Sequence, residues 1–176
     1  MNVIKTPIEG ILVIESKVFS DDRGHFFESW SQEAFEREGL NLNFVQDNQS
    51  LSAKGVLRGL HFQNPPFAQG KLVSVITGSV MDVVVDIRRD SKTFGHWIGE
   101  YLNDKNRKQF WIPPGLAHGF VVISEYADLY YKLTQYYDPA DEGRLIWDDD
   151  DVGIKWPVKK PLLSKKDQKG LSLKDL

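Results

Sequence analysis

The strongest constraint on the fold of this chain is a series of short apolar or alternating runs separated by turn residues. The runs are GILVIES, GHFFESW, KLVSVITG, VMDVVVDIR, WIGEYL, KQFWIPPG, GFVVIS and DLYYKLTQYY. Aromatic and β-branched residues dominate them, and Gly, Pro, Asn or Asp separate them at the spacing of a sandwich or barrel. The pattern predicts an antiparallel all-β fold, and we expect a jelly roll or another double-sheet barrel.

Two segments favour helical structure. SQEAFEREGL begins with Ser31 as an N-cap and ends with Gly39 as a C-cap, and the C-terminal SKKDQKGLSLKDL indicates one short turn. The sequence shows no internal repeat, no low-complexity tract and no Gly/Ser linker, and its 176 residues match the length of one domain. We therefore expect a single domain over residues 1–176, with a few short peripheral helices.

Charge and composition exclude several classes of function. The formal net charge is −3, from 22 Lys and Arg against 25 Asp and Glu, so bulk attraction to nucleic acid or to an anionic membrane is not expected. Cysteine is absent, which excludes disulfides and thiol catalysis. No stretch approaches the roughly 18 apolar residues of a membrane span, and the N-terminus lacks a signal-peptide cleavage site. A soluble cytoplasmic protein is the expectation.

The stretch RGLHFQNPPFAQGKLV places four polar side chains among residues typical of a sheet interior: Arg58, His61, Gln63 and Lys71. In an unbroken strand Arg58 and His61 point to opposite faces, because side chains alternate. The two can share a pocket only if the strand bulges, and Gly59 is the place where a bulge is expected.

A lysine that points into a barrel loses hydration, which is costly unless it meets an anion or a polarised carbonyl. A buried base beside a buried cation suits proton abstraction from the carbon next to a ketone, since the cation stabilises the enolate oxygen. His61 and Lys71 are the candidates for these roles. The alternative reading of His61, a core histidine bonded to a backbone carbonyl, remains open at this point.

The other candidates come from later strands. His118 follows the Pro-Pro-Gly turn of WIPPGLAHGF, and His61 with His118 and a distant carboxylate would make a metal site, although the sequence has no His-x-His pair. In DLYYKLTQYY, Tyr131 shares a strand face with Leu129 and Leu133. A tyrosine that faces inward could return a proton to an enolate, whereas the outward ones serve packing.

The ordered motifs DDRGHFFESW, FVQDNQS, GVLRGLHFQNPPFAQGKLV, GSVMDVVVDIRRDSKTFGHW, WIPPGLAHGF, YYKLTQYY and GIKWP closely resemble the dTDP-4-dehydrorhamnose 3,5-epimerase family. The resemblance runs from about Lys5 to Asp167. It implies a cupin-type jelly roll that acts as a homodimer, uses no metal and no cofactor, and inverts C3 and C5 of dTDP-4-dehydro-6-deoxy-D-glucose. The resemblance leaves open a single-centre epimerase of a related dTDP-sugar, a metal-dependent cupin, and a non-catalytic sugar-binding module.

The resemblance also implies roles for individual residues. His61 matches the general base and Asp167 the carboxylate that orients it, while Lys71 matches the enolate-stabilising lysine and Tyr131 the general acid on the other face of the sugar. Contacts to the dTDP-sugar are implied for Arg23, Glu28, Gln46, Asn48, Arg58, His118, Glu142 and Lys166. Of these, Arg58 matches a diphosphate ligand, and Arg23 and Glu28 match residues that reach the nucleotide partly across the dimer interface.

Three positions depart from the family pattern. Ser74 stands where arginine is common, Met81 where an aromatic residue or leucine is frequent, and His25 where an aromatic residue is common. Simple strand alternation points Ser74 and Met81 away from the residues with predicted chemistry. We therefore expect both to affect packing or an interface rather than the reaction.

Overall fold

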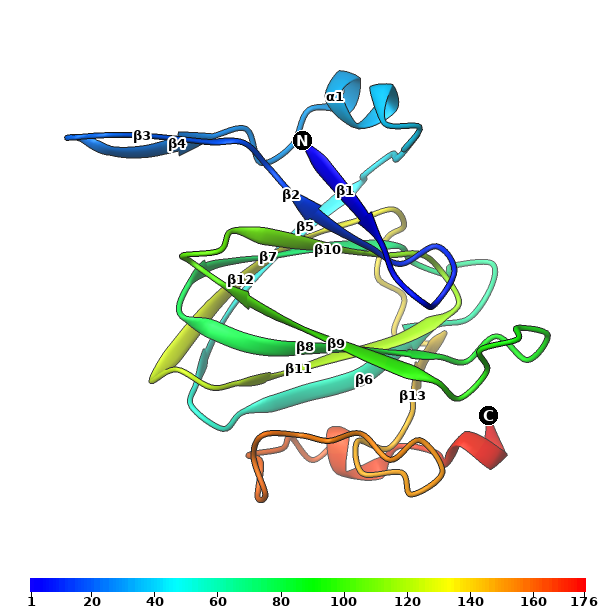
Figure 1. Ribbon diagram of the computed structural model, residues 1–176. Coiled ribbons are helices and arrows are strands. Elements are labelled where there is room, and N and C mark those ends of the chain that lie inside the picture. Colours follow the sequence, from blue (N-terminus) through cyan, green and yellow to red (C-terminus); the bar gives the residue numbers. More distant parts are fainter.

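The computed structural model describes residues 1–176, which fold into two antiparallel sheets that face each other (Figure 1). The first sheet has the spatial order β1 (Asn2–Lys5), β2 (Leu12–Glu15), β10 (Lys108–Ile112), β7 (Lys71–Thr77), β12 (Tyr126–Leu133) and β5 (Gln46–Ala53). The second has the order β13 (Glu142–Arg144), β6 (Leu57–Gln63), β11 (Leu116–Val122), β8 (Ser79–Asp86) and β9 (Trp97–Asn103). The predicted all-β jelly roll is confirmed.

The smaller elements lie around this double sheet. A hairpin of β3 (Val18–Asp21) and β4 (Gly24–Phe27) projects away from the body of the molecule (Figure 1). Helix α1 (Gln32–Arg37) follows it. The C-terminal segment forms two 3-10 helices, η1 (Asp167–Lys169) and η2 (Leu173–Asp175), where the sequence indicated one turn. None of the helices has the length and apolar character that a membrane crossing requires.

Helix α1 begins and ends close to the predicted positions. Ser31 caps its N-terminus by accepting a hydrogen bond from the Ala34 N–H. The C-cap residue is Glu38, and Gly39 follows it with a φ of +78°, a conformation that glycine adopts without strain. Phe35, the buried residue of the helix, packs on Trp111 and Leu72 of the outer face of the six-stranded sheet.

Two cores explain why β8 reads as an almost continuous apolar run. Val80 and Val84 pack between the two sheets, in the larger cluster, whereas Met81, Val83 and Val85 point to the opposite face. That second face is covered by the C-terminal third of the chain, including Trp147 and Trp156. Both faces of the strand are therefore buried, and period-2 alternation of polar residues disappears from the sequence.

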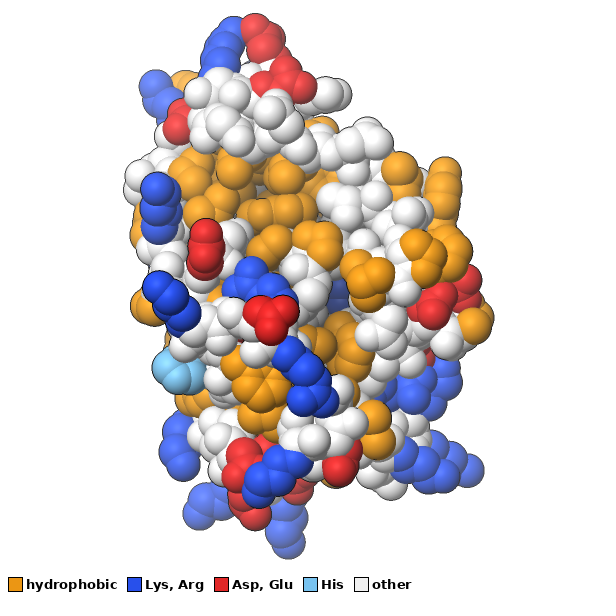
Figure 2. Space-filling model, turned by 90° about the vertical axis from the view of Figure 1, so that its right-hand side faces the viewer, with side chains coloured by type: hydrophobic (Ala, Val, Ile, Leu, Met, Phe, Trp, Pro, Cys, Tyr) orange, Lys and Arg blue, Asp and Glu red, His pale blue; other side chains and the backbone are white.

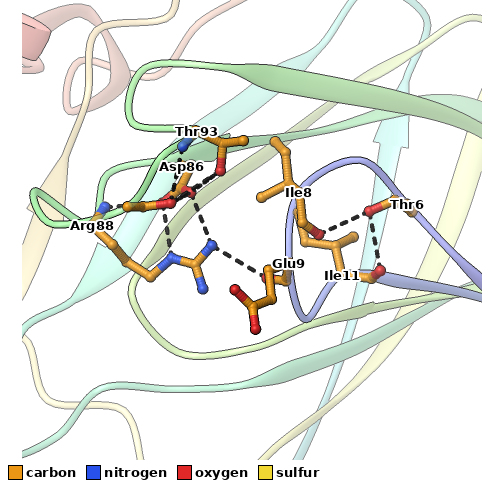
Figure 3. A network of polar contacts seen from close by, with 8 residues as sticks. Thr6, Ile8, Glu9, Ile11, Asp86, Arg88 and Thr93 are labelled. Atoms are coloured by element: carbon orange, nitrogen blue, oxygen red, sulfur yellow. Dashed lines mark hydrogen bonds and ion pairs between the residues drawn. The ribbon is translucent and has the colours of Figure 1, made fainter.

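A polar network fixes the loop after β8 (Figure 3). Asp86, at the end of β8, is fully buried and accepts hydrogen bonds from Arg88 Nε at 2.9 Å and from the hydroxyls of Ser91 and Thr93 at 2.6 Å each. Arg88 Nη2 also donates to the carbonyl of Glu9 at 3.2 Å, which links this loop to the β1–β2 loop (Figure 3). Burial alone would raise the pKa of Asp86, but these donors hold it well below its usual range.

We expect Asp86→Asn to lower the free energy of unfolding by about 2–4 kcal/mol at pH 7, because Arg88 then loses its buried partner. A carboxyl group whose pKa is depressed on folding stabilises the fold above its unfolded pKa, near 4, and loses that contribution as the pH falls. Urea denaturation at pH 7 and at pH 3 should therefore show a smaller difference between the variant and the original protein at pH 3. Equal free energies of unfolding at pH 7 would contradict the argument.

Candidate active site

A bulge in β6 places two polar side chains on one face. Along β11 and β6, His118 lies opposite His61 and Phe120 lies opposite Arg58, so β6 has one more residue than β11 between these two pairs. Phe120 packs between the sheets, and Arg58 and His61 therefore share the inward face. Gly59 and Leu60 both lie within this irregularity, so the bulge includes the position at which the sequence predicted it.

Gly59 cannot be replaced without moving β11. Its φ is +130°, and a Cβ atom there would lie 2.5 Å from the Cα of Gly119 and 2.8 Å from the carbonyl oxygen of His118. We expect Gly59→Ala to lower kcat at least about tenfold, because His61 would be displaced from its position.

The matched control is Gly55→Ala, where φ is +79° but nothing lies within 4 Å of the added Cβ. It should destabilise the fold by about 1 kcal/mol through strain alone and leave kcat unchanged.

The inward face opens into a cavity of about 380 Å³ at one end of the barrel. This volume is within the range of small-molecule sites. Figure 2 views the molecule from that end, where hydrophobic side chains gather beneath a few charged residues at the top, and acidic and basic side chains mix in the lower half. The lining residues come from both sheets and the adjoining loops: Gln46, Asn48, His61, Phe62, Gln63, Gln69, Lys71, Tyr131, Leu133, Tyr137 and Glu142.

His61 is held by a carboxylate from the far end of the chain. Its Nε2 lies 2.5 Å from Oδ1 of Asp167, the buried first residue of η1, and the Ser164 hydroxyl donates to the other carboxylate oxygen at 2.7 Å. Burial would raise the pKa of Asp167, but the hydrogen bonds from His61 and Ser164 hold it below its usual value. An ionised Asp167 takes the Nε2 proton of the imidazole as a hydrogen bond, so Nδ1 carries the lone pair that can accept another proton.

Lys71 supplies a cation beside this histidine. Its Nζ donates to the backbone carbonyl of His61 at 3.4 Å. Burial lowers the pKa of Lys71 to about 8, against the opposing effect of the Asp82 and Glu142 carboxylates. The side chain is therefore mainly protonated at neutral pH. It is partly buried in the cavity wall, where a positive charge stabilises a nearby oxyanion more strongly than it does in bulk water.

Two more groups face this cavity or lie against it. Tyr131 is on β12, in the opposite sheet from His61, and packs against the inner core with its face toward the cavity. His118, next to His61 in register, is buried and its Nε2 lies 2.8 Å from Oδ1 of Asp82. Burial lowers the pKa of His118, with Asp82 opposing the shift, so the ring serves as a neutral hydrogen-bond donor.

Comparison with known proteins identifies the family of this chain. A sequence model of the family described as dTDP-4-dehydrorhamnose 3,5-epimerase matches residues 5–175. The chain belongs to this family. It is 55% identical to the dTDP-4-dehydrorhamnose 3,5-epimerase of Salmonella typhimurium, over 95% of this chain and 92% of that protein.

Solved structures of related epimerases share the fold of this chain. A crystal structure of a dTDP-6-deoxy-D-glucose-3,5-epimerase from Legionella pneumophila, in complex with dTDP-4-keto-L-rhamnose, is 48% identical with a TM-score of 0.94. The alignment covers 98% of this chain and 93% of that one. A more distant relative from Streptomyces niveus, 41% identical over 94% of this chain and 81% of that protein, is described as a dTDP-4-dehydrorhamnose 3-epimerase. The family thus includes members described as acting at one centre.

The structure brings most of the site residues that the sequence suggested to one place. His61, Lys71, Tyr131, Gln46, Asn48 and Glu142 line the cavity, and Asp167 and His118 lie behind its wall. Lys166 lies at the rim, with Nζ 3.6 Å from Oε2 of Glu142. Burial would raise the pKa of Glu142, but its ion pair with Arg144 holds the pKa below its usual value.

Three predicted ligand residues lie outside the cavity of a single chain. Arg23 and Glu28 are exposed on and after the projecting hairpin, and Arg23 pairs with Asp21. Arg58 lies on the inward face but remains exposed, and its Nε donates to the hydroxyl of Ser52, on β5 of the facing sheet, at 3.0 Å. One copy of the chain therefore does not bring these three residues to the cavity lining.

Sequence reasoning gave no role to three groups that shape the site. Gln63 is buried and binds both loops at the cavity mouth, donating to the carbonyl of Phe67 at 2.6 Å and accepting from the N–H of Asp138 at 2.9 Å. Ser164 anchors Asp167, and its position three residues earlier, in SKKD, was the available signal. The third group, Asp82, could have been noticed as a lone carboxylate inside an apolar strand.

The residues that depart from the family pattern lie away from the cavity, as expected. Ser74 faces outward and accepts a hydrogen bond from Gln109 at 3.3 Å. Met81 is buried in the core beneath the five-stranded sheet. His25 lies on the hairpin, where its Nδ1 is 3.1 Å from Nη2 of Arg107.

The donor set of a metal-dependent cupin is not assembled here. No three His, Asp or Glu side chains lie together in a way that could hold a metal ion. The Nε2 atoms of His61 and His118 each face a carboxylate instead, Asp167 and Asp82, in separate pairs.

Proposed function

We propose that the chain inverts C3 and C5 of dTDP-4-dehydro-6-deoxy-D-glucose and so forms dTDP-4-dehydro-L-rhamnose. One observation carries this proposal. A histidine oriented by a carboxylate lies on the five-stranded sheet, a lysine and a tyrosine lie on neighbouring strands of the facing sheet, and all three side chains line one cavity. Inversion of a carbon next to a ketone needs a base, an oxyanion partner and an acid on the other face.

The proposed steps use only protons and the substrate's own ketone. Nδ1 of His61 removes the proton from C3, and the electron pair of that C–H bond moves to the C4 oxygen, whose negative charge Lys71 stabilises. When the enolate collapses, carbon takes a proton from the Tyr131 hydroxyl on the opposite face. Solvent returns a proton to the tyrosine and accepts one from the histidine. The same steps at C5 complete the reaction, and no redox cofactor is needed.

The nucleotide part of the substrate requires further contacts. We assign Gln46, Asn48, His118, Glu142 and Lys166 to polar contacts around the cavity. Arg58 is suited to the diphosphate, because a planar guanidinium can donate two parallel hydrogen bonds to it. Since the net charge of the chain is negative, a few placed cations of this kind must attract the anionic ligand.

We further propose that two copies of this single domain form the working enzyme. The projecting hairpin exposes 71% of Phe26 and carries Arg23, and the outer face of the six-stranded sheet exposes 55% of Ile76 and 66% of Leu51. Apolar side chains exposed at this level favour an interface. Arg23 and Glu28 would then reach the nucleotide bound by the partner copy.

Proton NMR in deuterium oxide tests the proposed reaction. Incubation of dTDP-4-dehydro-6-deoxyglucose with the enzyme should introduce deuterium at both C3 and C5, and trapping of the product by a downstream reductase should show inversion at both. Exchange at C3 alone would indicate a single-centre epimerase, as the Streptomyces niveus relative is described. Absence of exchange at both carbons would contradict the proposal and favour a sugar-binding module. Stoichiometric iron or zinc in protein purified without chelator would favour the metal-dependent alternative.

A further inference from the structure

The buried carboxylate of Asp82 has no role in the proposed reaction. Asp82 lies in the middle of β8, between Val80 and Val84, and both valines pack in the core between the sheets. Its side chain is 0% exposed. An ionised carboxylate in such a place costs several kcal/mol unless another group compensates its charge.

Hydrogen bonding satisfies only half of this carboxylate. Oδ1 accepts a hydrogen bond from Nε2 of His118 at 2.8 Å, whereas Oδ2 has no hydrogen-bond partner. Because His118 is kept neutral by burial, its ring does not cancel the negative charge. The compensating positive charge must come from another element that faces the same interior.

Lys71 is the cation in a position to do this. It begins β7, whose next inward residues, Val73 and Val75, pack in the same cluster as the valines on either side of Asp82. Nζ of Lys71 donates to the carbonyl of His61, His61 lies opposite His118 in register, and His118 contacts Asp82. The ionisable groups in this part of the interior come from five strands: His61 of β6, Asp82 of β8, His118 of β11, Tyr131 of β12 and Glu142 of β13. Of the two carboxylates among them, Glu142 is already paired with Arg144 and Lys166.

We propose that Asp82 is a positioning residue whose buried negative charge keeps the Lys71 ammonium protonated inside the cavity. This inference rests on the proposed function, in which Lys71 must carry a positive charge when the enolate forms. His118 has a supporting part, because its hydrogen bond fixes the carboxylate in the apolar strand. Asp82 and His118 thus act on the reaction through Lys71, and neither contacts a reacting atom.

The test measures the ionisation of Lys71 directly, in the substrate-free enzyme. Nitrogen-15 NMR of lysine-labelled protein, with the signal assigned by its loss in Lys71→Arg, should give a pKa near 8 for the original protein. Asp82→Asn keeps the size of the side chain and removes its charge, so the pKa of Lys71 should fall by at least about one unit. The alkaline limb of the kcat profile should shift to lower pH by the same amount.

Two controls separate charge from structure. Asp86→Asn removes an equally buried carboxylate from the same strand, but one that is held by Arg88, and should leave the pKa of Lys71 unchanged. His118→Asn retains a donor for Asp82 and its charge, and should also leave that pKa unchanged. If Asp82→Asn does not fold, Asp82→Ser provides the same comparison.

An unchanged Lys71 pKa in the Asp82 variants would overturn the inference, even if their activity fell. This result is distinct from failure of the proposed function, which would appear as missing deuterium exchange in the original enzyme. A lowered Lys71 pKa with unchanged pH dependence of kcat would likewise overturn it, because the charge of Lys71 would then not matter to turnover.

Discussion

Replacement of His61 by alanine is expected to lower kcat at least about a hundredfold and to abolish deuterium exchange at both C3 and C5. The reason is that one imidazole serves both carbons in the proposed reaction, and the enolate cannot form without a base. The NMR assay in deuterium oxide checks this, since it detects proton removal even when no inversion follows. Exchange that continues at one carbon at the original rate would contradict a single shared base.

Controls for this prediction come from Asp167, the partner of His61, and from an unrelated histidine. Asp167→Asn keeps the shape of the side chain but offers His61 a weaker partner, so kcat should fall while exchange remains detectable. His96→Ala removes an exposed histidine outside the cavity and should leave kcat unchanged. Thermal melting of each variant separates loss of chemistry from loss of fold.

The fold was predictable because its signals are local. Turn residues, β-branched runs and the Ser31 cap of α1 each act over a few positions, and the structure contains the strands and the helix that they indicate. The bulge in β6 was also predictable, since Arg58 and His61 could share a face in no other way and Gly59 offered the freedom for it. The two turns at the C-terminus were harder, because short 3-10 helices depend on tertiary contacts more than on sequence pattern.

The pairing of side chains from distant parts of the chain was not accessible to local reasoning. His61 and Asp167 are 106 positions apart, and no periodicity relates a residue of β6 to one in a C-terminal turn. Resemblance to the family suggested that pair, and the geometry adds Ser164 as its anchor. The same limit applies to Asp82 and His118, because strand counting gives the face of a residue but not the residue that it meets on the neighbouring strand.

Tyr131→Phe should separate proton removal from inversion. His61 and Tyr131 line the cavity from opposite sheets, so a sugar ring between them presents one face to each. Without the hydroxyl, the enolate can still form and take deuterium back from the His61 side, which restores the original configuration. We therefore expect deuterium at C3 or C5 of unchanged substrate, together with a loss of inverted product of at least about a hundredfold.

The adjacent tyrosine provides the control for this variant. Tyr130 is on the same strand but faces outward, where its hydroxyl donates to Asp47 at 2.7 Å. Tyr130→Phe removes the same atom from the other face of the sheet and should leave both exchange and inversion unchanged. If Tyr131→Phe lost exchange and inversion together, the hydroxyl would be needed before the enolate forms, and its assignment as the acid of the second step would be wrong. If inversion continued at the original rate, another donor would have to lie on that side of the cavity.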